Sequence, residues 1–422
     1  MKVFIKTLGC KVNQYESEAM AELFEKKNYE IVKSESAADI IIVNTCSVTA
    51  LAESKSGKSL RRAKRLNKEA IVCAVGCYSQ VSENVPNMPE VDLVLGTGSK
   101  GRIVELVEDF IKLREKKVAV SEMPKDFEPL FITNTADRTR AVMKIQDGCN
   151  QFCSYCIIPY ARGRIRSRSL EDIKREAYSL AQNGFKEVVL TGIHVASYAF
   201  KNSKLIDVIE KVSEVSGIER IRLSSLEQSV ISDDFLERIK YNEKFCHHFH
   251  LSLQSGSASV LKRMNRHYTP FEYRKKVEKI RNVFPDCAIT TDIIVGFPLE
   301  SDGEFQETLN FVNEVKFSKI HIFPFSPRTG TPAAKMFQVP NEIKTERVEI
   351  LTEIEKNLRY DFMESFLGKK MCVLAEKETE NGFWLGHTSN YLSVIFKSSG
   401  DCHNSFFDVL IERREEDNLS GR

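Results

Sequence analysis

DGCNQFCSYC, residues 147–156, is the stretch from which the fold is best deduced. Its cysteines, Cys149, Cys153 and Cys156, are spaced C-x3-C-x2-C and directly follow the apolar run AVMKIQ. Thiolates are soft ligands that suit zinc ions and iron–sulfur clusters. Three of them leave one coordination position open, which a metal needs if it also holds a substrate or cofactor. By ligand count we favour a catalytic iron–sulfur cluster over a zinc site and over unligated thiols.

The run before the cysteine loop is the first of six apolar runs between residue 139 and about residue 330. Helical patterns separate these runs, which are AVMKIQ, EVVLTGIHV, RIRLSSLE, HHFHLSLQS, AITTDIIVGF and KIHIFPF. Alternating strands and helices indicate parallel β-sheet, and six units are fewer than the eight of a closed barrel. We therefore predict a partial β/α barrel whose chemistry lies at the carboxyl ends of its strands.

The first hundred residues also alternate apolar runs with helical patterns, which predicts a second parallel sheet. Three successive strands end in a cysteine, namely Cys10, Cys46 and Cys77. Strand register would bring all three to one edge of the sheet, where ligands bind in such folds. Reduced thiols of a cytosolic protein are better explained by metal binding than by disulfides. The alternative is three unrelated cysteines at strand ends.

Changes in composition divide the chain into four segments. The whole is predicted to be an α/β protein, and its segments are an N-terminal parallel-sheet domain at 1–112, a linker at 113–137, a partial (β/α)6 barrel at 138–365 and a small β-barrel at 366–422. The last segment holds short strand patterns and carries seven Lys and Arg against nine Asp and Glu. A domain of that charge attracts phosphate poorly, which puts a nucleic-acid role of the barrel in question.

The net charge is only +2, so any affinity for nucleic acid must come from local basic stretches. Two stretches stand out, and their candidate phosphate contacts are Arg61, Arg62 and Arg65 in the first and Arg162, Arg164 and Arg166 in the second. The first stretch is also explained by a solvated helix face. No apolar segment has the length that crosses a membrane, and the N-terminus lacks a signal-peptide pattern, so we expect a cytoplasmic protein without a membrane partner.

Several motifs, in this order, resemble those of the radical S-adenosylmethionine (SAM) methylthiotransferase family. They are LGCKVNQYES, IVNTCSV, GCYSQ, DGCNQFCSYCIIPYARG, SLQSGS, DIIVGFP and FPFSPRTGTPAA, and they cover nearly the whole chain. The wording KVNQYES is most similar to the branch that acts on N6-threonylcarbamoyladenosine in tRNA. The resemblance implies that Cys149, Cys153 and Cys156 hold a [4Fe–4S] cluster that cleaves SAM, and that Cys10, Cys46 and Cys77 hold an auxiliary [4Fe–4S] cluster.

The resemblance also implies the reaction. A 5′-deoxyadenosyl radical from the first SAM removes hydrogen from C2 of adenosine 37, and sulfur from the auxiliary cluster is methylated by a second SAM, giving the 2-methylthio product. Partners would be tRNA, an electron donor and a sulfur source. In such a reaction the cofactors carry out the radical and sulfur chemistry, and the protein binds and positions them.

Weaker candidates for the cofactor or substrate pocket lie at or near strand ends. They are Tyr155, Glu227, Gln254, Ser255 and Asp292. Tyr155 precedes the last cluster cysteine, and ordinary loop packing explains it equally well. Two other functions stay open: methylthiolation of N6-isopentenyladenosine in tRNA, and a non-catalytic zinc-bearing RNA-binding protein.

Overall fold

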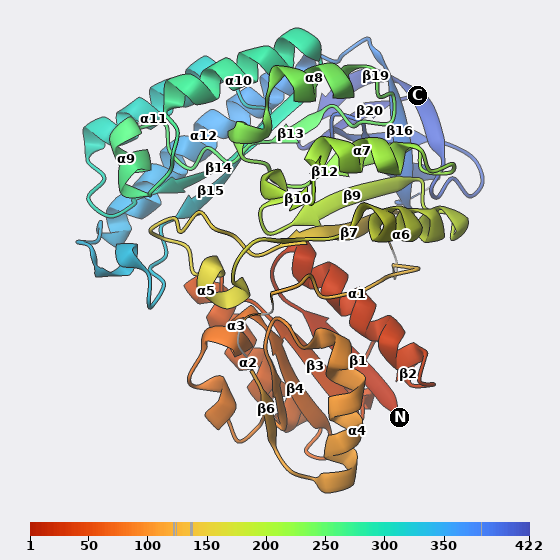
Figure 1. Cartoon of the computed structure of the whole chain (residues 1–422). Helices are drawn as coiled ribbons and strands as arrows, with labels where there is room; N and C mark the ends of the chain where they lie inside the picture. The colour runs from red at the N-terminus through yellow and green to blue at the C-terminus, as the bar shows by residue number, and fades with distance from the viewer. Residues whose placement is uncertain (121–122, 124, 136–137, 381) are drawn as a thin grey trace.

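The computed structural model describes residues 1–120, 123, 125–135, 138–380 and 382–422. Figure 1 shows an N-terminal α/β unit below a larger β/α unit, with a small barrel beside the latter. The predicted α/β class with a parallel N-terminal sheet, a partial barrel and a C-terminal β-barrel is confirmed. Within the part of the chain just given, no helix combines the length and apolar character needed to cross a membrane.

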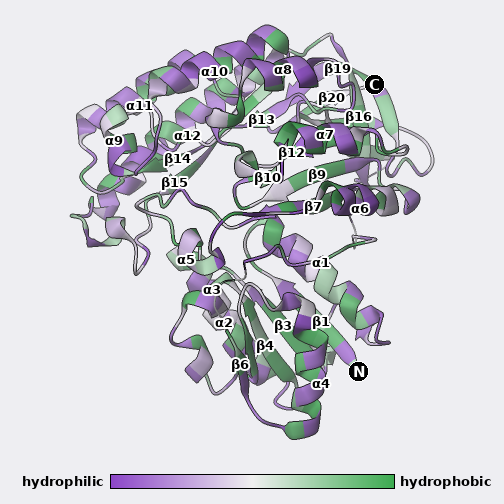
Figure 2. Cartoon of the chain, viewed as in Figure 1, coloured by the Kyte–Doolittle hydropathy of each residue, from purple (hydrophilic) through white to green (hydrophobic). Residues whose placement is uncertain are grey.

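The N-terminal unit is a six-stranded parallel sheet in the order β2-β1-β3-β4-β5-β6. Its elements are β1 (Lys2–Thr7), α1 (Lys11–Glu25), β2 (Glu30–Ile31), β3 (Ile40–Thr45), α2 (Ala50–Leu66), β4 (Ile71–Gly76), α3 (Cys77–Val81), β5 (Leu93–Leu95), α4 (Ile103–Leu113) and β6 (Lys117–Ala119). Strands β3 and β4 are buried along their whole length, as expected for parallel strands covered on both faces. Their apolar side chains belong to the hydrophobic core, and these strands are coloured as hydrophobic in Figure 2.

Strand β6 lies inside the segment predicted to be a linker, so that prediction is wrong for residues 117–119. They pair with β5 at the edge of the sheet. Three residues at an edge carry too short an apolar pattern to be recognised in sequence. Residues 121–122, 124, 136 and 137 of the predicted linker lie outside the described residues.

The six predicted barrel strands are all present. They are β7 (Arg140–Asp147), β9 (Glu187–Gly192), β12 (Arg220–Leu223), β13 (His248–His250), β14 (Ala288–Val295) and β15 (Lys319–Pro324). Strands β12, β9 and β7 form one parallel group and β13, β14 and β15 another. Two isolated parallel bridges, Ile221 to Phe245 and Leu226 to Leu251, join the groups. The strands thus follow one another in chain order as a partial barrel.

Helices cover the outside of the partial barrel (Figure 1). They are α6 (Leu170–Gln182), α7 (Leu205–Ser213), α8 (Asp233–Lys240), α10 (Pro270–Val283), α11 (Asp302–Val315) and α12 (Asn341–Glu364), with the short helices α5 (Ile158–Arg162) and α9 (Ala258–Arg263) nearer the site. Helices α10 and α11 begin with capping boxes, Thr269 with Glu272 and Ser301 with Glu304. Two-residue strands complete the unit, namely β8 (Arg166–Ser167), β10 (Ala199–Phe200) and β11 (Ser203–Lys204).

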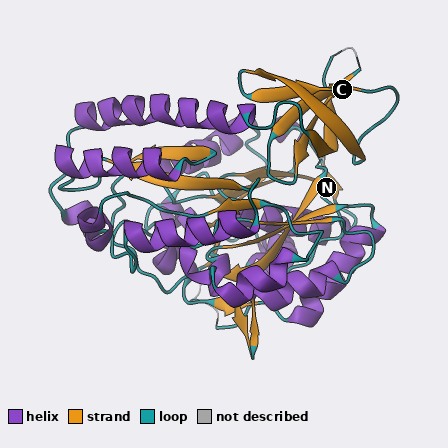
Figure 3. Cartoon of the chain, turned by 90° about the horizontal axis from the view of Figure 1, so that it is seen from above, coloured by secondary structure: helices purple, strands orange, loops and turns teal. Residues whose placement is uncertain are grey.

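The C-terminal unit is a closed barrel in the order β16-β17-β18-β20-β19. Its strands are β16 (Lys370–Glu378), β17 (Phe383–Thr388), β18 (Ser393–Lys397), β19 (Phe406–Glu415) and β20 (Asn418–Gly421). Figure 3 shows this barrel grouped at one end of the molecule. Arg220 and Arg222 of β12 donate to backbone oxygens of residues 372 and 387–389. These hydrogen bonds connect the C-terminal barrel to the partial β/α barrel.

Candidate functional site

The N-terminal cysteines gather at the carboxyl edge of the sheet, as predicted. Cys10 caps α1 after β1, Cys46 follows β3, and Cys77 opens α3 after β4, and these three strands are neighbours. Gly9 has a φ of +99°, and a Cβ placed on it would lie 2.7 Å from the Cys46 Sγ. Glycine therefore satisfies both the left-handed backbone and the close approach of the Cys46 sulfur.

Asparagine side chains fix the two loops that carry Cys10 and Cys46. The Asn13 amide donates to the carbonyl oxygens of Leu8 and Thr45, at 2.7 and 2.9 Å. The Asn44 amide donates to the Asn13 carbonyl oxygen at 2.8 Å. Sequence reasoning missed both residues, because an asparagine near a cysteine, here three positions after Cys10 and two before Cys46, gives no specific signal without knowledge of the fold.

The thiols of this first triad lie close enough to affect one another. Burial, together with the neighbouring Cys77 and Cys10, raises the pKa of Cys46 to about 11. Burial also raises the pKa of Cys77. Because a metal ligand must be a thiolate, binding of a metal here releases protons.

The barrel cysteines lie in the loop between β7 and α5. Cys149 N–H donates to the Gly163 carbonyl oxygen at 3.0 Å, and Ser154 N–H donates to the Met264 carbonyl oxygen at 3.0 Å. The first bond holds the loop against the residue that follows α5, and the second holds it against the residue that follows α9. Burial raises the pKa of Cys156 to about 12, with Cys153 and Cys149 adding to the rise, so this second triad is gathered as well.

The sulfur spacing of both triads is too wide for a single zinc ion. Within the described residues, neither triad brings its three Sγ atoms within 4.8 Å of one another. Tetrahedral zinc with Zn–S bonds of about 2.3 Å needs sulfur atoms roughly 3.8 Å apart. N–H groups also point at the sulfurs: Gln151 N to Cys149 at 3.5 Å, Arg266 Nη1 to Cys153 at 3.4 Å and Arg162 Nε to Cys77 at 3.2 Å. Such bonds are typical of cysteines that bind iron–sulfur clusters.

Arg162 connects the two triads. It follows the second triad in the chain, yet its Nε donates to the first triad at Cys77. Its Nη1 donates to Glu16 Oε1 at 2.7 Å, and its Nη2 donates to Asn13 Oδ1 at 2.7 Å. The side chain is 0% exposed.

A buried charge network surrounds this guanidinium. Lys144 Nζ lies 2.7 Å from Glu16 and 2.6 Å from Asp147, and Lys100 Nζ lies 3.3 Å from Glu16. Burial favours the neutral carboxylic acids, but the cations outweigh it and hold the pKa values of Glu16 and Asp147 below their ordinary range. The buried charges at the interface between the N-terminal unit and the β/α unit are therefore paired with charges of opposite sign.

Two predicted phosphate contacts are wrong. Arg162 and Arg166 are buried, and Arg166 lies 3.5 Å from Asp147, so neither reaches a nucleic acid. Arg164 is exposed, with its guanidinium 4.7 Å from the centre of the Phe152 ring. In α2, Arg61, Arg62 and Arg65 are all exposed, and Arg62 pairs with Glu35 at 3.4 Å.

The predicted pocket residues have different surroundings. Glu227 receives a hydrogen bond from His194 at 3.0 Å and lies 3.7 Å from Arg266, the arginine that donates to Cys153. Although burial favours its neutral form, these partners lower the pKa of Glu227. The residue is thus linked to the second triad through Arg266.

Ser255 is wrong as a pocket residue. It is 0% exposed, and its hydroxyl bonds to Thr308 inside the β/α unit. Gln254 is nine-tenths buried with a φ of +72°, and its backbone bonds to Asp292 and Ile294. Tyr155 packs edge-on against Phe297. Its contact with a cofactor stays a prediction.

A cavity of about 660 Å³ opens inside the partial barrel, a size suited to a nucleoside. Its walls come from the barrel strands, α12, the C-terminal barrel and Lys11. Asp292, one of the predicted pocket residues, lines this cavity. A second cavity of about 280 Å³ adjoins it, since Lys11 and Tyr391 line both. Sequence reasoning missed Lys11 and Tyr391, because no local pattern connects residues so distant in the chain.

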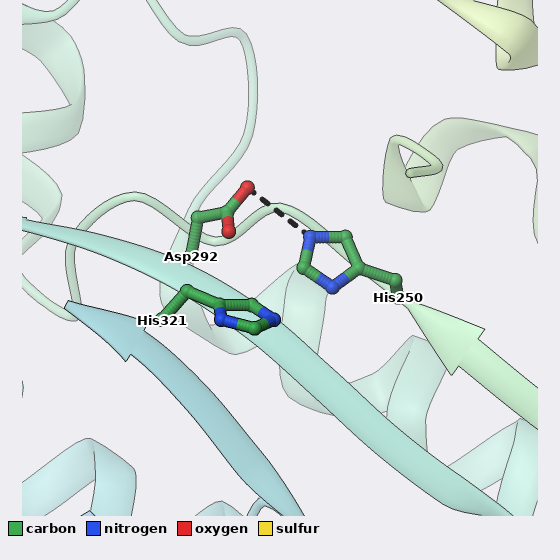
Figure 4. Close-up of side chains that lie close together, drawn as sticks. All are labelled: His250, Asp292 and His321. Carbon is green, nitrogen blue, oxygen red and sulfur yellow. Dashed lines mark hydrogen bonds and ion pairs between the residues drawn. The ribbon is translucent and has the colours of Figure 1, made fainter. Parts of the chain in front are cut away.

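His250, Asp292 and His321, which line the larger cavity, lie close together (Figure 4). Their ligand atoms lie within 4.8 Å of one another, which invites a metal interpretation. However, both ring nitrogens of His250 are occupied, by Asp292 at 3.1 Å and by Thr290 at 2.9 Å. Although burial opposes it, the bond from His250 helps to lower the pKa of Asp292. The group is therefore a hydrogen-bonded wall of the cavity.

Comparison with protein families gives two matches. Residues 143–312 match the radical SAM superfamily, and residues 2–96 match a family described as Uncharacterized protein family UPF0004. The first range begins in β7 and includes the second triad. The second range spans β1 to β5 and includes the first triad.

Curated relatives match nearly the whole chain. The chain is similar to threonylcarbamoyladenosine tRNA methylthiotransferase of Bacillus subtilis (strain 168), with 41% identity over 97% of this chain and 93% of the relative. Its counterpart in Aquifex aeolicus (strain VF5) is 42% identical over 93% of this chain and 96% of the relative. A tRNA-2-methylthio-N(6)-dimethylallyladenosine synthase of Acetivibrio thermocellus is 35% identical over 99% of this chain and 90% of the relative.

Solved structures share the fold at low identity. The radical S-adenosylmethionine methyltransferase TsrM from Kitasatospora setae aligns with a TM-score of 0.59 and 12% identity, covering 79% of this chain and 75% of that one. The cobalamin-dependent S-adenosylmethionine radical enzyme OxsB aligns with a TM-score of 0.54 and 14% identity, covering 84% of this chain and 56% of that one. These likenesses bear on the fold alone.

Proposed function

The chain belongs to the radical SAM tRNA methylthiotransferases, and from this premise we propose that it converts N6-threonylcarbamoyladenosine at position 37 of tRNA to its 2-methylthio form. It is a transferase that uses SAM and a [4Fe–4S] cluster. The observation that carries the proposal is the pair of cysteine triads on facing edges of two units, joined by Arg162. Relatives that carry the threonylcarbamoyladenosine name support the choice of substrate.

In this proposal each triad has its own role. Cys149, Cys153 and Cys156 would hold the cluster that binds and cleaves SAM, and Cys10, Cys46 and Cys77 would hold an auxiliary cluster. When bound, such clusters supply the electron for SAM cleavage and the sulfur that is transferred. Arg266 and Arg162, which donate to cysteine sulfurs, would stabilise the negative charge of each site.

Three further partners belong to the proposal. Two SAM molecules would be used per turnover, one for the radical and one for the methyl group. An electron donor and a sulfur source would serve the two clusters. Because the substrate is tRNA, the enzyme would act in the cytoplasm.

The proposal is tested by metal analysis and by nucleoside mass spectrometry. We expect anaerobically purified protein to contain about eight irons per chain, as two four-iron clusters require. We also expect tRNA from a deletion strain to keep N6-threonylcarbamoyladenosine and to lack its 2-methylthio form. One zinc per chain without iron would contradict the enzyme, and loss of the 2-methylthio form of isopentenyladenosine instead would assign the other substrate.

Exposed arginines of α2 supply a prediction about tRNA affinity. Replacing Arg61 and Arg65 by Gln should weaken tRNA binding and lower the slope of log affinity against log salt by roughly one per lost phosphate contact. Filter binding at several salt concentrations measures this slope. The matched control replaces Lys112 and Arg114, exposed at the end of α4 on another side of the sheet, by Gln. Equal effects of the two double variants would count against α2 as a tRNA surface.

A further inference from the structure

The smaller cavity, of about 280 Å³, has a basic wall. Five cationic side chains line it, and they are Lys11, Arg138, Arg140, Arg222 and Lys377. Among the described residues of this wall, Glu376 is the only carboxylate. The cations come from α1, from β7 and the segment before it, from β12 and from β16, which pack together here. A cavity lined by one sign of charge concentrates ions of the opposite sign.

Nearby carboxylates offset three of the five cations. The ion pairs are Arg140 with Glu376 at 3.2 Å, Arg222 with Glu187 at 2.7 Å and Arg138 with Glu18 at 3.5 Å. The ammonium groups of Lys11 and Lys377 form no ion pair or hydrogen bond within the described part of the chain. Burial and the like charges of Arg140 and Arg222 lower the pKa of Lys11. An anion bound in the cavity would offset this repulsion between cations.

Arg140 has hydrogen-bond donors that a ligand can reach. A guanidinium carries five N–H donors, and within the described residues the Arg140 side chain makes one hydrogen bond, to Glu376. Its side chain is 20% exposed at the cavity wall. The Arg222 guanidinium is instead bonded to Glu187 and to backbone carbonyl oxygens of the C-terminal barrel, so it contributes charge alone. Both guanidinium groups lie against the Tyr391 ring, 5.0 and 4.6 Å from its centre.

The position of the cavity indicates the kind of anion. It adjoins the larger cavity, whose size suits a nucleoside, and Lys11 and Tyr391 line both. Every nucleoside inside an RNA chain lies between two backbone phosphates. We propose that Lys11, Arg140 and Lys377 bind a backbone phosphate of the tRNA that flanks the target nucleoside. The inference deepens the proposed function and rests on it. Phosphate contacts fix the register of a bound nucleic acid, so this site would direct the nucleoside into the larger cavity.

The test uses anticodon stem-loop RNAs in which one phosphate has lost its charge. Two such RNAs each carry a neutral methylphosphonate, one on the 5′ side and the other on the 3′ side of nucleoside 37. We expect one of them to bind the wild-type protein ~10- to 100-fold more weakly than the unsubstituted RNA, the range for a hydrogen bond to a charged group. The double variant Lys11→Met/Lys377→Met should bind the unsubstituted RNA more weakly and lose most of this difference, as coupled groups do in a double-mutant cycle. Filter binding measures the affinities.

Controls separate the possible outcomes. Lys27→Met/Lys397→Met removes two exposed lysines outside the cavity and should keep the full methylphosphonate effect. SAM also carries a carboxylate, so saturating SAM should leave the effect in the wild type unchanged, and its disappearance would assign the cavity to SAM. Equal binding of all three RNAs by the wild type, or a full effect in Lys11→Met/Lys377→Met, would overturn the phosphate site. Wild-type protein that binds none of the RNAs would instead overturn the proposed function.

Discussion

Alanine at Cys149, Cys153 or Cys156 is expected to abolish SAM cleavage, whereas alanine at Cys10, Cys46 or Cys77 should spare cleavage and abolish methylthio transfer. The reason is that each triad is gathered at its own sheet edge, so loss of one thiolate removes one site and leaves the other. Iron should fall from about eight to about four per chain in either set. The 5′-deoxyadenosine and the methylthiolated nucleoside, both measured by mass spectrometry, report the two activities separately.

Cys73 provides the matched control. It lies on β4, the strand that leads to Cys77, and is 0% exposed in the hydrophobic core. Cys73→Ala should keep both activities and the full iron content, with a modest loss of stability from the small cavity. Equal loss of both activities in the two triads would contradict separate sites.

The second large effect is expected on stability. Arg162→Met removes a buried guanidinium that bonds to Cys77, Glu16 and Asn13 across the interface of the two units. Breaking a buried charge pair from one side costs about 3–5 kcal/mol when the remaining charge has no other partner. Because Glu16 keeps Lys144 and Lys100, we expect a cost toward the lower end of that range. We expect a clear fall in the urea midpoint of the anaerobic protein. Arg164→Met, two residues along and exposed, should change the free energy of unfolding by less than about 0.5 kcal/mol.

The pH dependence of this effect has a definite sign. Because the folded-state pKa values of Glu16 and Asp147 are lowered, their contribution to stability is present above their unfolded values and is lost as the pH falls. The difference between Arg162→Met and wild type should therefore be full above about pH 5 and shrink in stronger acid. Equal urea midpoints of variant and wild type at neutral pH would show that the network adds nothing.

Both cysteine triads could be predicted because their signal is local. Each cysteine of the first triad follows an apolar run, and strand order in a parallel sheet brings such positions together, whereas the three cysteines of the second triad share one short loop. The six barrel strands were predictable for the same reason, since buried strands produce strong apolar runs. Strand β6 was missed because its three edge residues produce none.

The burial of two of the arginines after the second triad could not be predicted from the sequence. A run of Arg162, Arg164 and Arg166 indicates a phosphate surface, but only Arg164 of the three is exposed. The buried Arg162 pairs with Glu16, which lies 146 positions earlier in the chain and becomes its neighbour only when the two units pack together. Tyr391 likewise meets its neighbours only in the folded protein, since it lines the larger cavity from the C-terminal barrel. That barrel thus contributes to the cavity wall despite its acidic composition.

The link between Arg162 and Glu16 also bears on how the chain folds during synthesis. The ribosome releases the first sheet long before Arg162, so the nascent α/β unit emerges with Glu16 lacking both Arg162 and Lys144. Of its three cationic partners, Glu16 then has only Lys100, which belongs to the same unit, so its charge is less well compensated and disfavours burial of α1. We therefore expect the nascent unit to reach its final packing only after the β/α unit has been made, when Arg162 arrives at Cys77.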